Sequence, residues 1–306
     1  MLSRVANNLY WLARYLERAE NTARLINVNS HLLLDLPSTV KLGWEPIVDI
    51  LSFRSTFYDL YEEADENSVI SFMLVDEKHP GSIVSSLSAA RENARTVKEI
   101  IPREAWEQIN QLFYFVTENS KAAFKRRSRY EYLSKIILAN QTITGMLAGT
   151  MTQDEAYSFV RIGRNLERAD MSTRIIDVRS ASLLPELEHD LAAFRNIQWM
   201  SVLKSMTAYQ MYRREVRVRI NRKDVLSFLF LETRFPRSLA HTIEQIEKSL
   251  LELPNNKNAV ERIRALSSYL RNANPANLAQ EKLHDFIDEI QAGLIEIDEN
   301  IESIYF

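Results

Sequence analysis

A charged segment of seventeen residues occurs twice in this chain, and this duplication constrains the fold more than any other feature. Residues 12–28 read LARYLERAENTARLINV, and residues 162–178 read IGRNLERADMSTRIIDV. Aligned without gaps, eight of the seventeen positions are identical. These are Arg14/Arg164, Leu16/Leu166, Glu17/Glu167, Arg18/Arg168, Ala19/Ala169, Arg24/Arg174, Ile26/Ile176 and Val28/Val178. A solvated surface gives no reason for the same charged residues to recur in the same order.

Both copies have the spacing of an amphipathic helix. At about 100° per residue, Leu12, Leu16 and Ile26 fall on one face of the first copy. Its Arg and Glu residues fall on the opposite face, and the second copy repeats this division. We therefore predict one long helix from about Ser3 to Leu34. A second is predicted to begin after the capping residue Thr152 and to run to about residue 184.

Apolar residues recur at helical spacing through nearly all of the remaining chain. Only 6 Gly and 8 Pro occur in 306 residues, which disfavours architectures that need frequent tight turns. Further helices are predicted at about 44–64, 67–76, 82–101, 102–125, 129–150, 190–219, 223–232, 236–253, 257–273 and 275–304. We predict an all-α fold, a single helical bundle over 1–306 with the two long pseudo-repeat helices at its centre. The similarity is confined to those two helices, although a division into pseudo-equivalent halves of about 1–150 and 151–306 is compatible with it.

The composition excludes several classes of site. The chain has no Cys, so disulfides, zinc–thiolate sites and cysteine nucleophiles are ruled out. It has no apolar run long enough to span a membrane and no signal-peptide pattern at its N-terminus, and we expect a cytoplasmic protein. The net charge of −3 argues against nucleic-acid binding. Two basic clusters, at 125–129 and 213–223, are interpreted as solvated helix ends and connections.

The repeated polar faces allow three interpretations. They could be solvated, with weak ion pairs along each helix. They could pack together, so that Glu17 pairs with Arg168 and Arg18 with Glu167 in a reciprocal arrangement that sets helix register. They could instead line a cleft in which arginines bind a carboxylate or phosphate and a glutamate binds an amine or acts as a base. RENAR at 91–95 is a weaker third copy, expected to join the same polar layer.

These arguments define one candidate cluster, either interhelical or ligand-binding. Its members are Arg14, Glu17, Arg18, Asn21, Arg24, Arg91, Glu92, Asn93, Arg95, Arg164, Glu167, Arg168, Asp170 and Arg174.

Two E-x-x-H spacings, Glu186/His189 and Glu281/His284, are reminiscent of metal sites in helical bundles. Glutamate is abundant here and no further paired ligands are evident, so we interpret both as chance and expect no metal. The sequence also lacks a glycine-rich phosphate loop and the nucleophile motif of hydrolases. We therefore expect no cofactor.

Several stretches, in order, resemble the alpha-E domain family, all-helical bacterial proteins with a repeated Glu-Arg motif. They are LSRVANNLYWLARYLERAENTARL at 2–25, SLSAARENARTVKEIIPREAWEQIN at 86–110, GTMTQDEAYSFVRIGRNLERADMSTRIIDV at 149–178 and FLFLETRFPRSL at 228–239. All members of the candidate cluster match this motif pattern, and so does Phe235-Pro236-Arg237-Ser238. Asn165 departs from it, since an apolar residue is commoner there.

The resemblance implies an uncharacterised protein that works beside a circularly permuted ATP-grasp ligase, and sometimes a transglutaminase-like protein, in peptide synthesis or modification. It implies no catalytic residue. Our first hypothesis is a non-catalytic helical accessory or scaffold protein for such a ligase. The alternative is an enzyme or ligand-binding protein whose Arg/Glu cleft binds a carboxylate-bearing peptide or amino acid. The sequence leaves open whether any reaction is catalysed.

Overall fold

The computed structural model describes residues 1–35, 43–181, 192–216 and 220–306, and every regular element in these ranges is a helix. This confirms the predicted all-α fold. The α-helices are α1 (Ser3–Asp35), α2 (Glu45–Ile50), α3 (Arg54–Leu60), α4 (Glu66–Leu74), α5 (Ile83–Thr96), α6 (Arg103–Asn119), α7 (Arg126–Thr150), α8 (Glu155–Ala181), α9 (Ala192–Ser205), α10 (Tyr209–Val216), α11 (Arg222–Leu231), α12 (Leu239–Leu251), α13 (Lys257–Asn272) and α14 (Gln280–Tyr305). Short 3₁₀ helices occupy Ser120–Phe124 and Pro275–Asn277.

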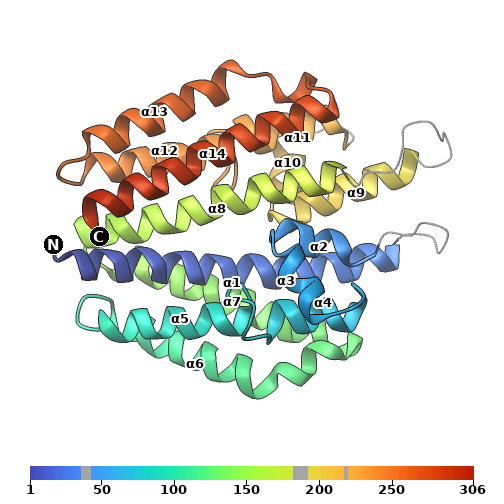
Figure 1. Ribbon diagram of the computed structural model, residues 1–306, viewed down its shortest axis with the longest axis horizontal. Coiled ribbons are helices and arrows are strands. Elements are labelled where there is room, and N and C mark those ends of the chain that lie inside the picture. Colours follow the sequence, from blue (N-terminus) through green and yellow to red (C-terminus); the bar gives the residue numbers. More distant parts are fainter. Residues whose placement is uncertain (36–42, 182–191, 217–219) are drawn as a thin grey trace.

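The two repeat-bearing helices, α1 and α8, lie side by side and point the same way through the middle of the molecule (Figure 1). Contacts between them join residues about 150 apart, such as Asn29 with Arg179 and Tyr10 with Gly163. Helices joined this way are parallel and in register, so equivalent positions of the two repeats face each other. Their apolar faces turn away from this contact and enter a single buried core that includes residues of both halves.

Each central helix has its own set of neighbours, and the two sets correspond. In Figure 1, α5, α6 and α7 lie below α1, whereas α12, α13 and α14 lie above α8. The closest helix pairs repeat this order: α1 packs on α5 and α7 as α8 packs on α12 and α14. Helices α1, α5, α6 and α7 thus form one four-helix unit and α8, α12, α13 and α14 the other, and α1 and α8 form the seam between the units.

Helix caps and turns outside the motif helices also recur in the same order in both halves. Asp65 caps the N-terminus of α4, and Asn221, which lies 156 positions later, caps that of α11. With the same offset, HPGS at 79–82 aligns with FPRS at 235–238, and the last residue of each tetrapeptide caps the next helix. The apolar residues of 65–82 differ from those of 221–238, so the repeat is hard to see in the sequence. The capping residues and turns identify it.

Some predicted helices are interrupted by a backbone conformation that periodicity does not reveal. The predicted helix 44–64 is divided into α2 and α3 near Ser52, which has φ 58°. The predicted helix 190–219 is divided into α9 and α10 near Thr207, which has φ 55°. Left-handed residues cannot continue a right-handed helix. The predicted helix 102–125 is also wrong at its end, because α6 stops at Asn119 and a 3₁₀ segment follows.

One glycine allows α1 and α8 to approach closely. A Cβ atom built on Gly163 would collide with the carbonyl oxygen of Tyr10 on the facing helix. This contact is with backbone, which cannot rotate away as a side chain can. Any larger residue at this position would push the two helices apart along the seam.

We expect Gly163→Ala to destabilise the protein by about 1–3 kcal/mol, because overpacking this contact forces a backbone shift. Gly145→Ala is the matched control, since a Cβ on Gly145 in α7 meets nothing within 4 Å. Alanine there is expected to stabilise by about 0.5–1 kcal/mol through its higher helix propensity. Urea titration followed by circular dichroism measures both, and a neutral or stabilising Gly163→Ala would contradict the close approach.

Candidate functional site

The two Glu-Arg dipeptides form a reciprocal pair of salt bridges across the seam. Arg18 donates from Nε and Nη2 to Glu167 Oε1 and Oε2, at 2.6 and 2.9 Å. Arg168 donates from the same two nitrogens to Glu17 Oε1 and Oε2, at 3.1 and 2.8 Å. Both are bidentate pairs, and they match the pairing predicted from the repeat. The pattern follows from helix geometry: Glu and Arg, adjacent in sequence, lie on either side of the line where the parallel helices touch.

Glu17 has a further arginine partner that comes from outside the repeat. Arg237, in the turn before α12, donates from Nη1 to Glu17 at 2.8 Å and to the amide oxygen of Asn21 at 2.8 Å. Its Nη2 donates to Glu20 at 2.8 Å. Glu20 also accepts from Arg24 one turn further along α1, at 2.5 Å. Arg237 therefore ties the second half of the chain to both carboxylates of α1.

Glu167 obtains its additional partner from within the repeat. Arg14 donates from Nε to Glu167 at 3.0 Å and from Nη1 to Asp298 of α14 at 2.6 Å. Tyr10 donates a hydrogen bond to the same Asp298. Next along α8, Asp170 accepts from Nε of Arg174 at 2.9 and 3.0 Å.

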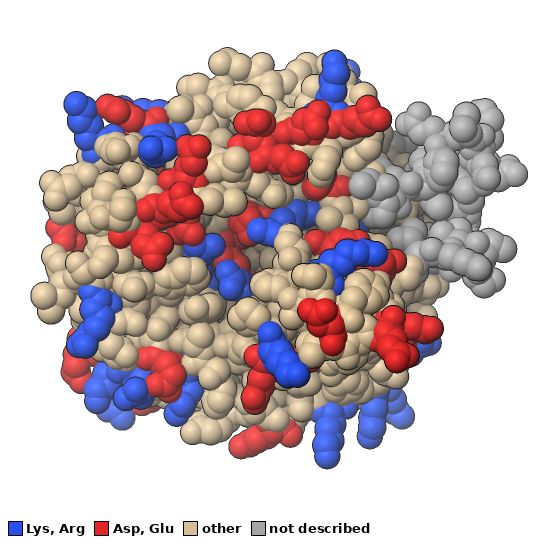
Figure 2. All heavy atoms as spheres, viewed as in Figure 1, with Lys and Arg blue, Asp and Glu red and all other residues tan. Residues whose placement is uncertain are grey.

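These residues together form the interhelical charged layer. It comprises Arg14, Glu17, Arg18, Glu20, Arg24, Arg164, Glu167, Arg168, Asp170, Arg174, Arg237 and Asp298. It has seven arginines against five carboxylates. In the view of Figure 2, acidic and basic side chains are mixed across the middle of the molecule, where Figure 1 places the contact of α1 and α8.

The two sides of the layer are not equivalent. Arg164 is the repeat equivalent of Arg14, yet no carboxylate of the described residues forms a salt bridge with it. Arg237 binds Glu17 on that side instead, and the residue aligned with Arg237 in the first half is Gly81. Burial, followed by the nearby Arg168, lowers the pKa of Arg164. The repeat thus predicts the central pairs but not the distribution of the remaining arginines.

The two glutamates are sealed and fully used. The side chains of Glu17 and Glu167 are 2% and 1% exposed, and each of their four carboxylate oxygens accepts at least one arginine N–H. Burial alone would raise the pKa of Glu17, but Arg168 and Arg237 outweigh it and hold this pKa well below its ordinary value. In the same way, Arg18 and Arg14 overcome burial and lower the pKa of Glu167 to about 2. Carboxylates with such low pKa values are poor general bases at neutral pH.

The predicted third copy of the motif does not join the layer, and this expectation is wrong. Arg91 donates to Asn110 on α6 at 2.7 Å and lies against the ring of Phe113. Glu92 pairs with Arg95 one turn away, at 2.9 Å. Both of these side chains are at least half exposed, and Asn93 is half-buried on the same helix. Helix α5 packs on α1, whereas the RENAR charges reach α6 and solvent.

Sequence reasoning missed Glu20, Arg237 and Asp298 as members of the layer. Glu20 belongs to the first repeat and aligns with Asp170, so its place could have been inferred. Arg237 stands in the FPRS stretch, and its signal was an arginine where the aligned HPGS tetrapeptide has glycine. Asp298 lies 284 residues from its partner Arg14, and no sequence pattern connects the two.

The E-x-x-H spacings do not form paired metal sites in the described residues. Glu186 and His189 lie outside them. His284 instead lies between two aspartates: Asp177 on α8, at 2.9 Å from Nδ1, and Asp288 on α14, at 3.6 Å from Nε2. These three residues could offer ligands to an ion, with ligand atoms within 4.8 Å of one another. His284 and Asp288 are more than half exposed, and such ion pairs form commonly without metal.

The basic clusters differ in character. The cluster at 213–223 lies partly outside the described residues. In the cluster at 125–129, Arg126 is exposed, but Arg129 is buried and pairs with Glu66 at 2.7 Å. The interpretation of this cluster as a solvated helix end is therefore wrong for Arg129. Among the described residues, no helix is both long and apolar enough to cross a membrane.

Comparison with known proteins identifies relatives but no activity. A family model named Alpha-E, described as a predicted alpha-helical domain with a conserved ER motif, matches residues 1–306. Uncharacterised proteins of Mycobacterium bovis and Mycobacterium tuberculosis are 24% identical over 319 residues, covering 95% of this chain and 35% of each relative. The chain thus spans about a third of the length of these curated relatives. No solved structure matches it.

We expect Glu167→Gln to lower the unfolding free energy by about 3–5 kcal/mol, because it removes the carboxylate that Arg14 and Arg18 share and leaves Arg18 without an anion. A double-mutant cycle with Arg18→Met should show a coupling of about 0.5–3 kcal/mol. Glu107→Gln is the control, since Glu107 makes an exposed pair with Arg103 and its loss should cost less than about 1 kcal/mol. Additive effects in the cycle would contradict a direct buried pair.

The stabilising effect of Glu167 should depend on pH. Its pKa in the folded protein is about 2, below the ordinary value of 4.5. Its contribution is therefore complete above about pH 4.5 and is lost as the pH falls toward 2. The stability gap between wild type and Glu167→Gln should narrow in urea titrations between pH 6 and pH 3, and a constant gap would show that Glu167 is not held ionised.

Proposed function

The chain belongs to the Alpha-E family, and we propose that it is a non-catalytic helical accessory or scaffold protein for an ATP-grasp amide ligase. The proposed system makes or modifies peptides, and in some cases would include a transglutaminase-like protein. This role implies a cytoplasmic location, where the ligase has access to ATP. The partner comes from the family resemblance, whereas the non-catalytic role is supported by the geometry of the seam.

The observation that carries the proposal is that the motif of the family is used internally. Glu17 and Glu167 are the residues most suited to acid–base chemistry, and arginines occupy all their oxygen atoms. Paired, sealed charges set helix register and orientation, even where their net contribution to stability is small. A rigid seam of this kind suits a protein that presents surfaces to a partner.

The length of the relatives supports a role beside other domains. In the mycobacterial proteins the matching region is 35% of the chain, so a region like this one is joined there to much additional sequence. A module that is covalently joined to other regions in one protein is a reasonable candidate to bind separate partners in another.

The alternative, an enzyme or ligand-binding protein with its site in an Arg/Glu cleft, is less well supported at the seam. Substrate could reach Glu17 or Glu167 only by displacing a bidentate arginine from a buried carboxylate, which is costly. The excess of arginines, and Arg164 in particular, is the feature that favours it. Arg164 has the charge to attract an anion, but the glutamates beside it have no free oxygen for an amine.

We expect the purified chain to form a complex with an ATP-grasp ligase-like protein of the same organism and to change its rate of ADP release. Light scattering after size exclusion measures the complex. Glu17→Gln separates the two hypotheses: below its melting temperature it should retain the effect on the ligase if the pair is structural. Loss of the effect in a folded Glu17→Gln variant would favour the cleft, and absence of both complex and rate change would refute the proposal.

A further inference from the structure

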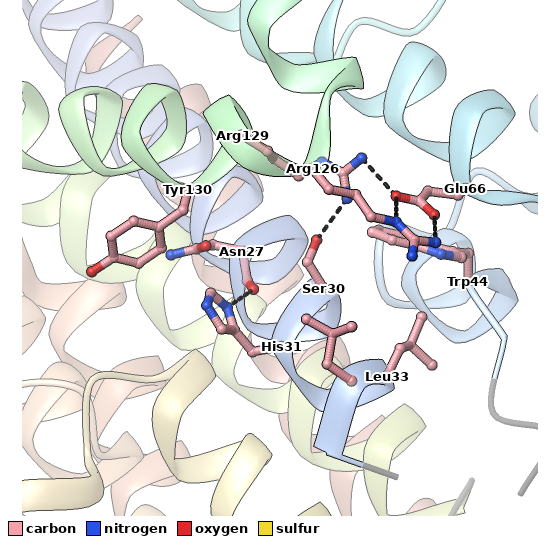
Figure 3. Close-up of a pocket in the computed structure, with 10 residues that line it drawn as sticks. Asn27, Ser30, His31, Leu33, Trp44, Glu66, Arg126, Arg129 and Tyr130 are labelled. Carbon is pink, nitrogen blue, oxygen red and sulfur yellow. Dashed lines mark hydrogen bonds and ion pairs between the residues drawn. The ribbon is translucent and has the colours of Figure 1, made fainter. Parts of the chain in front are cut away.

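A cavity of about 170 Å³ lies away from the charged layer, beside the C-terminal end of α1. Trp44 and Tyr130 form aromatic walls on two sides, and Leu33 and Leu34 add aliphatic surface (Figure 3). A cavity of about 150 Å³ accommodates benzene, so this one can hold one ring or one branched side chain. Mostly apolar walls with a few polar groups are typical of small-molecule sites.

One edge of the cavity is strongly basic. Arg126 and Arg129 both line it and share a single carboxylate, Glu66, at 2.6 and 2.7 Å. Figure 3 shows the two guanidinium groups converging on Glu66 beside Trp44. Arg126 uses Nε and Nη2 for this contact, and its Nη1 donates no hydrogen bond to any described residue. Two cations therefore face one anion at the edge of an apolar cavity.

The position of these cations in the fold makes the excess charge more notable. The KRRSR segment begins α7, whose first turn contains no acidic residue and whose N-cap makes no side-chain hydrogen bond. The N-terminal end of a helix carries partial positive charge and normally attracts acidic residues. Basic side chains at this end are unfavourable unless an anion lies nearby, and Glu66 is the one carboxylate of the described residues that pairs with Arg126 and Arg129.

At the opposite edge of the cavity lies a side-chain oxygen atom that accepts no hydrogen bond. Asn27 lines the cavity, and its Oδ1 is buried with no hydrogen-bond partner among the described residues. A buried acceptor left unsatisfied costs about 1–3 kcal/mol. A ligand N–H group would recover this once the Asn27 amide turned toward the cavity, because Oδ1 is shielded from solvent in the present conformer. In contrast, the neighbouring ring of His31 is engaged with the carbonyl oxygen of Asn27 at 2.8 Å (Figure 3).

We infer that this cavity binds an amino acid or the carboxy-terminal residue of a peptide. The ligand carboxylate would bind Arg126, its amide or ammonium N–H would donate to Asn27 Oδ1, and an aliphatic or aromatic side chain would lie against Trp44 and Leu33. The inference goes beyond the scaffold role and does not depend on it. If the chain fails to bind a ligase, the inference of a ligand site in this cavity still stands. If it fails to bind a carboxylate ligand, the proposed ligase complex still stands.

The test is calorimetric titration of the full chain with N-acetyl-leucine, which carries all three recognition groups. N-acetyl-leucinamide lacks the carboxylate, and 4-methylpentanoate lacks the N–H group. We expect N-acetyl-leucine to bind, and the amide to bind at least about tenfold more weakly because it lacks the charge-assisted hydrogen bond. Asn27→Ala should weaken the binding of N-acetyl-leucine but not the binding of 4-methylpentanoate.

Arg126→Gln should weaken N-acetyl-leucine by at least about tenfold without unfolding the chain, because the Arg126 side chain is 74% exposed. Arg103→Gln is the matched control, since it also removes one exposed, glutamate-paired arginine, but at the far end of α6. It should change affinity less than about twofold, because the distance exceeds the range of screened charges.

Equal binding of the acid and the amide would overturn the inference, as would equal losses in Arg126→Gln and Arg103→Gln. Inorganic phosphate is a competitor in the same assay. If phosphate displaced N-acetyl-leucine at equal concentration, the site would be a general anion site and the assignment to a carboxylate ligand would be wrong. Absence of heat with N-acetyl-leucine at millimolar concentration would also reject it.

Discussion

The reciprocal salt bridges between Glu17 and Arg168 and between Arg18 and Glu167 are the interaction on which the rest of the structure depends. They join two parallel helices in a single register, because each arginine can reach the opposite carboxylate through two nitrogens only when equivalent positions face each other. A shift of one helical turn would take at least one of the two buried glutamates away from its bidentate arginine. Buried pairs that are broken cost far more than intact pairs contribute, so they act mainly by excluding other arrangements.

The seam also explains the position of the surrounding helices. Because the charged faces of α1 and α8 turn toward each other, their apolar faces point outward in opposite directions. Two helices then pack directly on each, α5 and α7 on α1 and α12 and α14 on α8, and α6 and α13 complete the two units seen in Figure 1. The absent side chain of Gly163 allows the helices to approach closely enough for short, bidentate contacts.

The two halves depart from the two-fold pattern at particular residues. Arg237 enters the layer from the second unit, where the first unit has Gly81, and this leaves Arg164 without a carboxylate. At the far end of α1, the first unit has a cavity with Asn27 and basic residues at its edges. The corresponding position on α8 holds Asp177, which binds His284. The charged layer is thus common to both halves, whereas the groups at its ends differ between them.

The sequence by itself determined the helical class and the two long central helices, and it gave the reciprocal Glu-Arg pairs as one of three interpretations. Helical periodicity is local, and identical charges at identical spacings allow few ways for two helices to satisfy each other. Only the tertiary structure decided that Arg237 and Asp298 complete the layer, that RENAR faces outward, and that Asn27, Trp44 and Arg126 surround one cavity. Those residues come from turns and from helices distant in the chain, and their meeting depends on how whole helices pack, which no local pattern encodes.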